Sequence, residues 1–371
     1  HFSMLKRKDD DKFLYYLAEK TNFLTTFVKK KENMERRLPA EWEPQSGVQL
    51  TFPHANTDWS DDLEEVVDCF RQIAREISMR EKLLVVAEDR LLAEEALDDC
   101  RQENLIITSL PTNDTWARDH APITIFENNQ PKLLDFVFNG WGLKFAADKD
   151  NQISRRLYMN RIFGNISLEA FNFVLEGGSI ESDGQGTLLT TAECLLSHNR
   201  NYPLTVGEIE ERLKAYLGVR RILWLHFGSL LGDDTDAHID TLARFCNPQT
   251  IAYVKCYDKN DPHYDGLRRM EEELQQFKQA DGKPYHLVAL PLPSAIYDQS
   301  GYRLPATYAN FLIINGAVLV PIYQVSEDKE AITLLRKCFP DREIIPIDCR
   351  VLIRQHGSLH CITMQYPLGV L

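Results

Sequence analysis

Three features are missing from this 371-residue sequence, and each absence narrows the class of protein. No run approaches the roughly 20 apolar residues that cross a membrane, and no glycine-rich loop of the phosphate-binding kind follows a strand-like segment. The eight cysteines show no CxxC pairing. Because a chain of this size needs no disulfide staples, such cysteines are typical of a reducing compartment. We therefore expect a cytoplasmic protein without a nucleotide cofactor.

Positive charge is also scarce. The 42 Lys and Arg residues are outnumbered by 55 Asp and Glu, which gives a formal net charge of -13. Nucleic acids and anionic membranes bind basic surfaces, so this balance argues against both as partners. It favours a small cationic molecule instead. The 44% hydrophobic and 26% charged residues are ordinary for a chain that folds around a sizeable core.

The first 33 residues differ in character from the rest. Charge runs at 6–12 and 29–31 accompany an apolar stretch that charged residues interrupt, and no clear cleavage site marks a signal peptide. We interpret residues 1–33 as an N-terminal extension or a vector-derived segment, with Met34 as the natural start. Residues 34–371 are expected to form a single catalytic domain.

One local order of elements recurs along the chain. From Asp58 to Glu81 the apolar residues fall at helical spacing, and the strand-like run Lys82–Ala87 follows. The same order of helix and then strand is predicted at Arg90–Leu110, Thr205–His226, Leu267–Leu290 and Lys329–Ile347. Repetition of such units predicts an α/β propeller, with a doubly wound sheet as the alternative.

Turn and cap signals punctuate these units. Hairpins are predicted at Ile180–Thr190 and at Ala309–Tyr323, where Asn315 and Gly316 are expected to supply the positive φ values of a two-residue turn. Thr205 and Glu208 have the spacing of a capping box, and Gly218 is a stop signal for the same helix.

Four short segments are dense in reactive side chains, and each has an ordinary explanation when taken alone. They are Thr115–His120, Leu175–Ser179, Gly232–Asp240 and His356–Thr363. A lone Glu-Gly-Gly is typical of a turn beside a solvated acid. The acids at 233, 234 and 236 also suggest a calcium loop, but the spacing and the bidentate Glu of an EF-hand are missing.

Among the eight cysteines, Cys361 is the one whose neighbouring reactive residues suggest catalysis. Most cysteines are inert core residues. His360 is its sequence neighbour, so on a strand the two side chains would point to opposite faces. His238 is therefore the better candidate for a base. His238 and Asp240 are two residues apart and would share one face of an extended strand, where they present a base and an acid to one small molecule.

The remaining acids suggest a guanidinium site. A guanidinium presents its donors in a plane and is matched by paired carboxylates. Asp119 and Asp240 provide the pair, and Glu176 adds a third acid. Trp116, close to Asp119 in the sequence, offers an aromatic face for a planar cation. A buried ion pair between Arg118 and Asp119 is the alternative explanation.

With these segments, and with Leu38–Gln45 and Pro305–Phe311, the sequence resembles the agmatine deiminase family of the guanidino-group-modifying (pentein) superfamily. The resemblance extends from about Arg37 to Pro367. It implies a five-fold pseudosymmetric α/β propeller (pentein) of ββαβ-type units. It also implies hydrolysis of agmatine to N-carbamoylputrescine and ammonia, a step in putrescine and polyamine biosynthesis, with no metal and no organic cofactor. Gln355–Ser358 replaces a run of glycines that is common in the family, and Ala237 replaces another glycine.

We assign roles on this basis. Cys361 attacks the guanidinium carbon, and His238 transfers protons. Substrate is held by Asp119, Glu176, Asp240 and Trp116. Trp141 and the acids of Asp233–Asp236 are candidates for binding the far end of the substrate.

Several alternatives stay open. They are a peptidyl-arginine or other guanidine deiminase, an amidinotransferase, and a catalytically silent protein that binds guanidines or polyamines. The sequence leaves the oligomeric state open and is compatible with a homo-oligomer.

Overall fold

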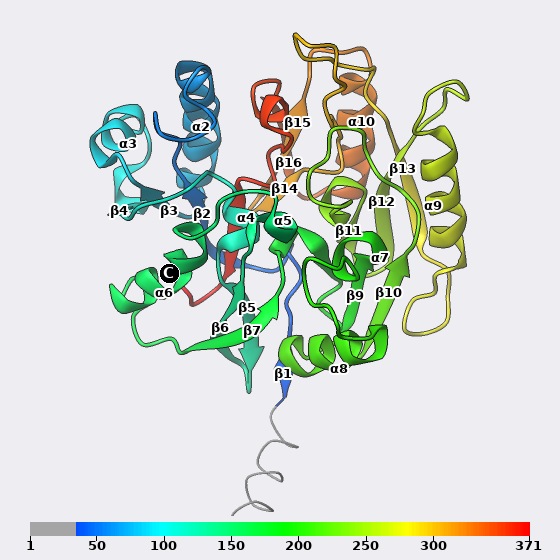
Figure 1. Ribbon diagram of the computed structural model, residues 1–371, viewed down its shortest axis with the longest axis horizontal. Helices are drawn as coiled ribbons and strands as arrows, with labels where there is room; N and C mark the ends of the chain where they lie inside the picture. The colour runs from blue at the N-terminus through cyan, green and yellow to red at the C-terminus, as the bar shows by residue number, and fades with distance from the viewer. Residues whose placement is uncertain (1–34) are drawn as a thin grey trace, which may run out of the picture.

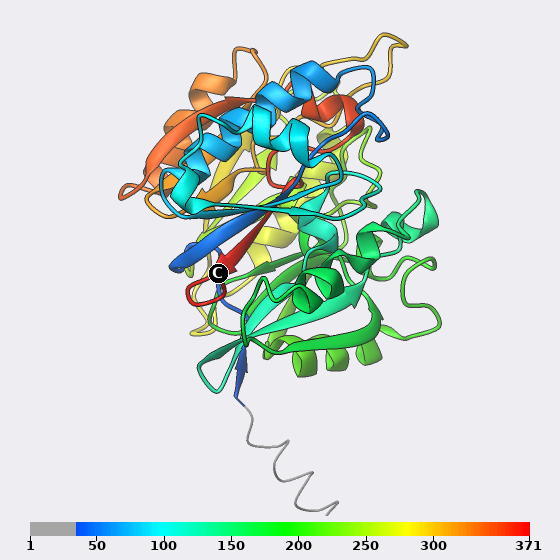
Figure 2. The ribbon, with the colours of Figure 1, turned by 90° about the vertical axis from the view of Figure 1, so that its left-hand side faces the viewer.

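The computed structural model describes residues 35–371, and the expectations for the first 33 residues lie outside this range. Within it the strands form five small sheets. The sheets surround a common centre, and the longer helices lie at the periphery (Figures 1 and 2). None of the helices between residues 35 and 371 combines the length and hydrophobicity that a membrane span requires.

Every sheet repeats one unit, in which an antiparallel hairpin is followed by a helix and then by a strand parallel to the hairpin's second strand. The first unit consists of β5 (Ile123–Glu127), β6 (Gln130–Val137), α6 (Ile153–Met159) and β7 (Leu168–Val174), and the second of β8 (Ile180–Ser182), β9 (Thr187–Thr191), α8 (Val206–Leu217) and β10 (Arg221–Leu225). The third consists of β11 (Ala243–Asn247), β12 (Thr250–Lys255), α9 (Tyr264–Gln276) and β13 (His286–Pro291). The fourth consists of β14 (Leu312–Ile314), β15 (Ala317–Ile322), α10 (Asp328–Cys338) and β16 (Glu343–Asp348). A short strand, β1 (Arg36–Arg37), pairs with β5.

The fifth unit joins the two ends of the described chain. Its hairpin consists of β17 (Thr363–Pro367) and β2 (Gln45–Thr51), which pair antiparallel, and α2 (Leu63–Ser78) leads to the parallel strand β3 (Lys82–Ala87). α3 (Arg90–Ala96) and β4 (Leu105–Ser109) extend this sheet. The predicted five-fold propeller is thereby confirmed, and the doubly wound sheet is wrong.

Local sequence signals explain several of these elements. On α2 the buried residues Val66, Phe70, Ile73 and Ile77 follow helical spacing and face the core. Helix α8 begins after Thr205, whose capping box with Glu208 is formed, and ends at Gly218 in the left-handed conformation. These are the boundaries that the sequence predicts.

One turn differs from its prediction. Gly316 has a φ of 74°, but Asn315 is not among the residues with positive φ. The Asn315 side chain instead accepts a hydrogen bond from the Gln45 amide at 3.1 Å and donates to the Gln45 carbonyl at 2.9 Å. Its amide group therefore links the β14–β15 turn to β2 of the neighbouring sheet.

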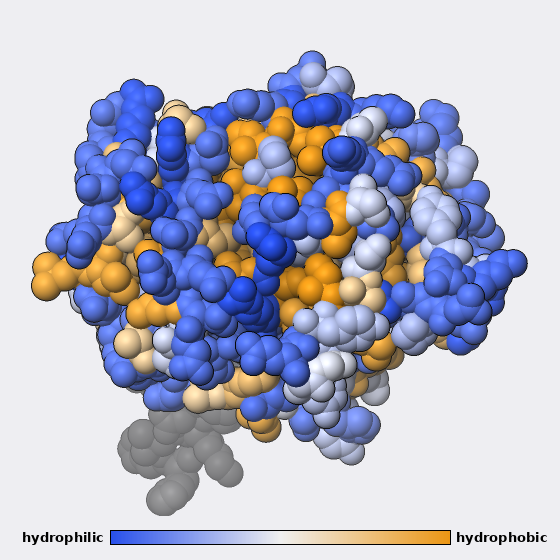
Figure 3. Space-filling model, turned by 90° about the horizontal axis from the view of Figure 1, so that it is seen from above, coloured by the Kyte–Doolittle hydropathy of each residue, from blue (hydrophilic) through white to orange (hydrophobic). Residues whose placement is uncertain are grey.

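Seen from above, apolar side chains are exposed in the middle of the face, with hydrophilic residues around them (Figure 3). The eight cysteines all lie within the described residues, and all are free. This agrees with the expectation of a chain without disulfide staples.

Candidate active site

Each of the five units contributes to one site from the segment that precedes its hairpin. Asp119 lies on α4 (Ala117–His120) before β5, and Glu176 precedes the 3-10 helix η3 (Gly177–Ser179) before β8. Asp240 lies on η4 (Ile239–Thr241) before β11. Asn310 and Cys361 precede β14 and β17. The pseudosymmetric fold therefore gathers side chains from distant parts of the sequence.

Cys361 is buried, and its thiol lies between an amide and a carboxylate. Sγ is 3.4 Å from Asn310 Oδ1 and 4.0 Å from Asp240 Oδ2. Burial raises the pKa of Cys361 well above its usual value, and the negative charge of Asp240, with that of Asp119 when it is ionised, raises it further. The resting group is therefore a thiol, and a cation beside it would favour the reactive thiolate.

Asp119 is fixed by two donors. Trp141 Nε1 donates to its Oδ2 at 2.8 Å, and the Gly178 amide donates to its Oδ1 at 2.9 Å. Burial raises the pKa of Asp119 to about 8, with contributions from the charges of Asp240 and Glu176. Asp119 is thus a carboxyl group that a bound cation would convert to the carboxylate.

Asp240 has the opposite tendency. Burial opposes its ionisation, but the His360 hydrogen bond and positive charges nearby outweigh burial and lower the pKa of Asp240. His360 Nδ1 lies 2.7 Å from Asp240 Oδ2. The other oxygen, Oδ1, is buried and has no hydrogen-bond partner among the described residues. This oxygen is available to a donor from a ligand.

His238 lies next to the carboxyl group of Asp119. Its Nδ1 is 3.7 Å from Asp119 Oδ1, and its Nε2 is buried without a partner in the described part of the chain. Burial lowers the pKa of His238 to about 3, so the resting imidazole is neutral. A Cβ atom on Gly178 would lie 2.6 Å from His238 Nδ1 and 2.9 Å from Asp119 Oδ1. Only glycine fits between them.

Glu176 lies close to His238 but is already paired. Arg200 Nε lies 2.9 Å and 3.1 Å from its two oxygens, and both side chains are fully buried. Burial raises the pKa of Glu176, and Arg200 partly offsets this effect. Direct hydrogen bonding of Glu176 to a substrate stays a prediction. The Arg200 pairing limits the lone pairs that remain for it.

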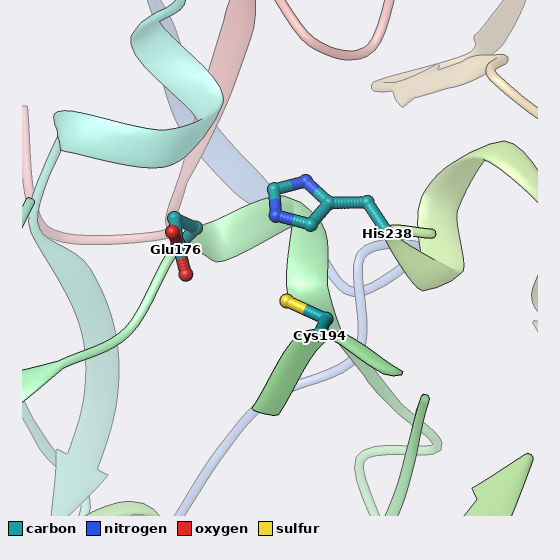
Figure 4. Close-up of side chains that lie close together, drawn as sticks. All are labelled: Glu176, Cys194 and His238. Carbon is teal, nitrogen blue, oxygen red and sulfur yellow. The ribbon is translucent and has the colours of Figure 1, made fainter. Parts of the chain in front are cut away.

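Two groups of side chains have the composition of metal ligands, with potential ligand atoms within 4.8 Å of one another. One is Glu176, Cys194 and His238, whose side chains converge in Figure 4. The other is Glu41, Glu181 and His360. In both groups an arginine already contacts the carboxylates, namely Arg200 in the first and Arg244 in the second. A metal cation would be repelled by these guanidinium groups.

A pocket of about 40 Å³ leads to the thiol. Cys361, Asp119 and Trp116 line it, and so does Trp141. The indole of Trp116 is held by a 3.0 Å hydrogen bond to Asp114 and lies so close to Gly357 that a Cβ there would be 2.1 Å from the ring. Three further acids, at positions 58, 114 and 234, complete the negative lining.

The structure corrects several sequence-based interpretations. His238 and Asp240 lie at a 3-10 turn and not on an extended strand. Arg118 donates to Gln365 at 2.6 Å and is not paired with Asp119. Trp141 donates to Asp119 and also lines the pocket, so its role toward the far end of a substrate stays a prediction.

The acids at positions 233, 234 and 236 have different surroundings: two are paired within the protein, and one lines the pocket. Asp233 accepts hydrogen bonds from Thr235 and Ala237 of its own loop, which satisfy its carboxylate without a calcium ion. Asp236 is paired with Arg200 and Lys144. Asp234 alone of the three lines the pocket.

Sequence reasoning missed three residues of the site, namely Asn310, Gly178 and His360. Asn310 lies inside the Pro305–Phe311 segment. The repeat could have identified it, because Asn310 occupies in the fourth unit the position that Asp119, Glu176 and Cys361 occupy in other units. Sequence spacing rejected His360 as a base for Cys361, and its contact with Asp240 depends on packing between units.

Comparisons with known proteins agree with this geometry. The family described as Porphyromonas-type peptidyl-arginine deiminase matches residues 37–367. An agmatine deiminase from Pseudomonas aeruginosa is 32% identical over 356 residues, which cover 89% of this chain and 95% of the relative.

Two solved structures are more similar in sequence. A Cys-to-Ser variant of agmatine deiminase from C. jejuni, with substrate bound, is 39% identical with a TM-score of 0.86, covering 91% of this chain and 98% of that one. A protein from Porphyromonas gingivalis with a provisional assignment as an arginine deiminase is 52% identical with a TM-score of 0.87, covering 91% and 99%. The chain belongs to the Porphyromonas-type peptidyl-arginine deiminase family, to which these agmatine deiminases are related, and is an enzyme acting on the guanidino C–N bond.

Proposed function

We propose that the protein hydrolyses agmatine to N-carbamoylputrescine and ammonia through a covalent intermediate on Cys361. One observation carries the proposal: the buried thiol of Cys361, which lines an acidic pocket together with Asp119, lies 4.0 Å from the carboxylate of Asp240 behind it. Such a site attracts a planar cation to the nucleophile. The likeness to substrate-bound agmatine deiminase supports agmatine as that cation.

The acidic lining also favours an amine at the far end of the substrate. At the end far from the guanidinium, agmatine carries only an ammonium group, whereas arginine carries an ammonium group and a carboxylate. The pocket is lined by Asp58, Asp114 and Asp234, and no Lys or Arg belongs to the described residues that line it. A carboxylate in this pocket would meet like charge without a basic partner, whereas an ammonium would be stabilised.

Substrate binding activates the nucleophile in the proposed mechanism. The guanidinium donates to Asp240 Oδ1, which has no partner among the described residues, and to Asp119, which releases its proton to solvent as the cation binds. The positive charge lowers the pKa of Cys361. The thiolate then attacks the guanidinium carbon, and a C–S bond forms.

His238 transfers the protons of the two half-reactions. It accepts the proton of the Cys361 thiol as the thiolate forms and donates this proton to the departing nitrogen. The C–N bond then breaks, and ammonia leaves an alkylated amidino group on Cys361. His238 then accepts a proton from water. The resulting hydroxide adds to the same carbon, the C–S bond breaks, and the ureido product and the thiol are released.

Peptidyl-arginine deimination is the second candidate, because the matching family takes its name from it. That substrate requires room for a polypeptide at the mouth. Here His356 Nδ1 contacts the Gly232 carbonyl at 2.7 Å, so the segment before Cys361 and the segment at 232 meet beside the pocket. This contact favours a small substrate over a peptide.

A substrate panel tests the proposal. Agmatine, arginine and an arginyl peptide are compared by ammonia release, with Cys361→Ser as the blank. We expect kcat/KM for agmatine to exceed that for arginine by at least about 100-fold, the order of discrimination that unpaired buried charges produce. A preference for the peptide or for arginine would contradict the proposal.

Mass spectrometry distinguishes hydrolysis from amidino transfer. A deiminase loses ammonia first, so acid-quenched enzyme should carry the mass of agmatine less ammonia on Cys361. An amidinotransferase loses the alkylamine first and would retain only the amidino group. Quenched protein without any adduct, together with an absence of turnover, would identify a silent binding protein.

A further inference from the structure

His360 lies behind the active site and contacts two carboxylates. Its Nδ1 is 2.7 Å from Asp240 Oδ2, and its Nε2 is 2.8 Å from Glu41 Oε2. The residue is 1% exposed. We propose that His360 is a positioning residue, which orients the Asp240 carboxylate for binding the guanidinium group. This inference rests on the proposed function and concerns a residue that the catalytic steps above do not use.

Orientation of Asp240 matters because its two oxygens have different tasks. Oδ2 faces His360 and lies 4.0 Å from the Cys361 thiol, whereas Oδ1 has no partner among the described residues. With a proton on Nδ1, the imidazole donates to Oδ2 and leaves Oδ1 for the ligand. Without it, rotation of the carboxylate would bring the two oxygens into other positions. Binding of a planar donor group depends on such alignment.

A buried ion network holds His360 in turn. Glu41 also accepts from the Ile313 amide and from Arg244, each at 2.7 Å. Arg244 is fully buried and pairs with Glu181 as well. Burial, Arg118 and Arg244 lower the pKa of His360, and the carboxylates at positions 41 and 240 counteract this effect. The imidazole of His360 is therefore held by Glu41 on the side opposite Asp240.

The network borders a polar pocket that is distinct from the substrate pocket. It has a volume of about 60 Å³ and is lined by Glu41, Glu181 and His360. Arg118 Nη2, Thr124 Oγ1 and Gln45 Oε1 belong to residues that line it, and none has a hydrogen-bond partner in the described protein. A polar pocket of this size accommodates water.

Two substitutions separate orientation from structural support. The amide nitrogen of Asn reaches about where imidazole Nδ1 lies, so His360→Asn retains a donor for Asp240. The amide nitrogen of Gln reaches about where Nε2 lies, so His360→Gln retains the donor for Glu41 only. Both variants are neutral. His226→Gln serves as a matched control, because His226 pairs with Glu273 at the surface.

The measurements are kcat, KM and the melting temperature of each variant. A hydrogen bond to a charged group corresponds to about 10- to 100-fold in affinity. We expect His360→Gln to lower kcat/KM by this factor, chiefly through KM, and His360→Asn to retain at least about tenfold more activity than Gln. His226→Gln should match the parent.

Three outcomes would overturn the inference: a parental KM in His360→Gln, equal losses in both variants with parallel losses of melting temperature, or a larger loss in Asn than in Gln. The parent's rate on agmatine tests the proposed function separately. The ratio between the variants is measured with any guanidine that the parent turns over, and as affinity for the guanidinium ion by calorimetry. Failure of agmatine as substrate therefore leaves the test of His360 intact.

Discussion

Burial keeps the reacting groups of this site in their neutral forms. It raises the pKa of Cys361, lowers that of His238 to about 3 and raises that of Asp119 to about 8. A buried cation lowers the pKa of Cys361 and of Asp119, because it favours the thiolate and the carboxylate. In the proposed mechanism the site therefore becomes reactive only when a guanidinium is bound. This arrangement protects the thiol from oxidants, which react with thiolates.

Asp119 predicts a pH dependence that can be measured without substrate. Its pKa is about 8 in the folded protein, against a reference value of 3.8. Because the unfolded state loses this proton at lower pH, folding stability should fall as pH rises from about 4 to about 8. Asp119→Asn removes this contribution, so its stability relative to the parent should increase with pH. Urea denaturation at pH 5 and pH 8 checks the sign. An unchanged difference would contradict the raised pKa.

The same group shapes the activity profile. The ionised carboxylate binds the cation, so kcat/KM of the parent should rise with pH and level off near pH 8.

His238 is expected to affect turnover more than binding. His238→Asn retains hydrogen bonding but cannot exchange a proton near pH 7. Turnover should therefore fall by about 10² or more, the lower limit for general acid-base catalysis, while KM changes little. Asp240→Asn is the matched comparison, since it removes charge next to the guanidinium and should raise KM as well. Stopped assays of ammonia release give both constants. A loss of only about threefold in His238→Asn would assign proton transfer to another group.

At the scale of elements, the short turns before each hairpin place the functional groups. Gly178→Ala tests this placement, because the new Cβ would lie 2.6 Å from His238 Nδ1. We expect turnover to fall by at least about tenfold, as displaced catalytic groups lose their alignment. Gly207→Ala is the control: Gly207 lies on α8, and a Cβ there meets nothing within 4 Å. This variant should keep parental turnover and gain about 0.5–1 kcal/mol in stability by urea denaturation. Equal turnover in both variants would contradict the close packing at η3.

Sequence reasoning succeeded for elements whose signals are local. The amphipathic spacing of α2 and the capping box at Thr205 depend only on neighbouring residues, and both are present. The same reasoning put His238 and Asp240 on a strand, although they lie at a 3-10 turn. Three or four residues of turn carry no periodic pattern, so local spacing does not distinguish the two conformations.

Contacts between units escaped prediction for a different reason. His360 reaches Glu41 across 319 positions of sequence, and Asn310 reaches Cys361 across 51. Neither pairing follows from periodicity. Both follow from the ring, in which equivalent turns of successive units meet at the centre. Knowledge of the repeat would have directed attention to Asn310, because it occupies the position that carries a functional residue in the other four units.

At the scale of the whole molecule, closure of the ring connects the two ends of the described chain to catalysis. β17 pairs with β2, and Cys361 lies two residues before β17. The proposed nucleophile is thus held by an antiparallel pair of strands that are separated by most of the sequence. Arg118 on α4 reinforces this position, because its amide donates to the Cys361 carbonyl at 3.1 Å.

The net charge of -13 predicts a dependence on ionic strength that separates long-range attraction from contact within the pocket. An acidic molecule attracts a dication more strongly than a monocation, and salt screens this attraction over about 10 Å at 0.1 M. Raising sodium chloride from about 0.02 M to about 0.3 M should therefore lower kcat/KM for agmatine several-fold, with kcat nearly constant. The monocation guanidinium, measured as a competitive inhibitor, should lose affinity with a shallower dependence on salt. Potassium acetate at equal ionic strength controls for specific effects of chloride. Equal slopes for the two cations would show that the overall charge does not assist binding, and the acids that line the pocket would then account for the preference alone.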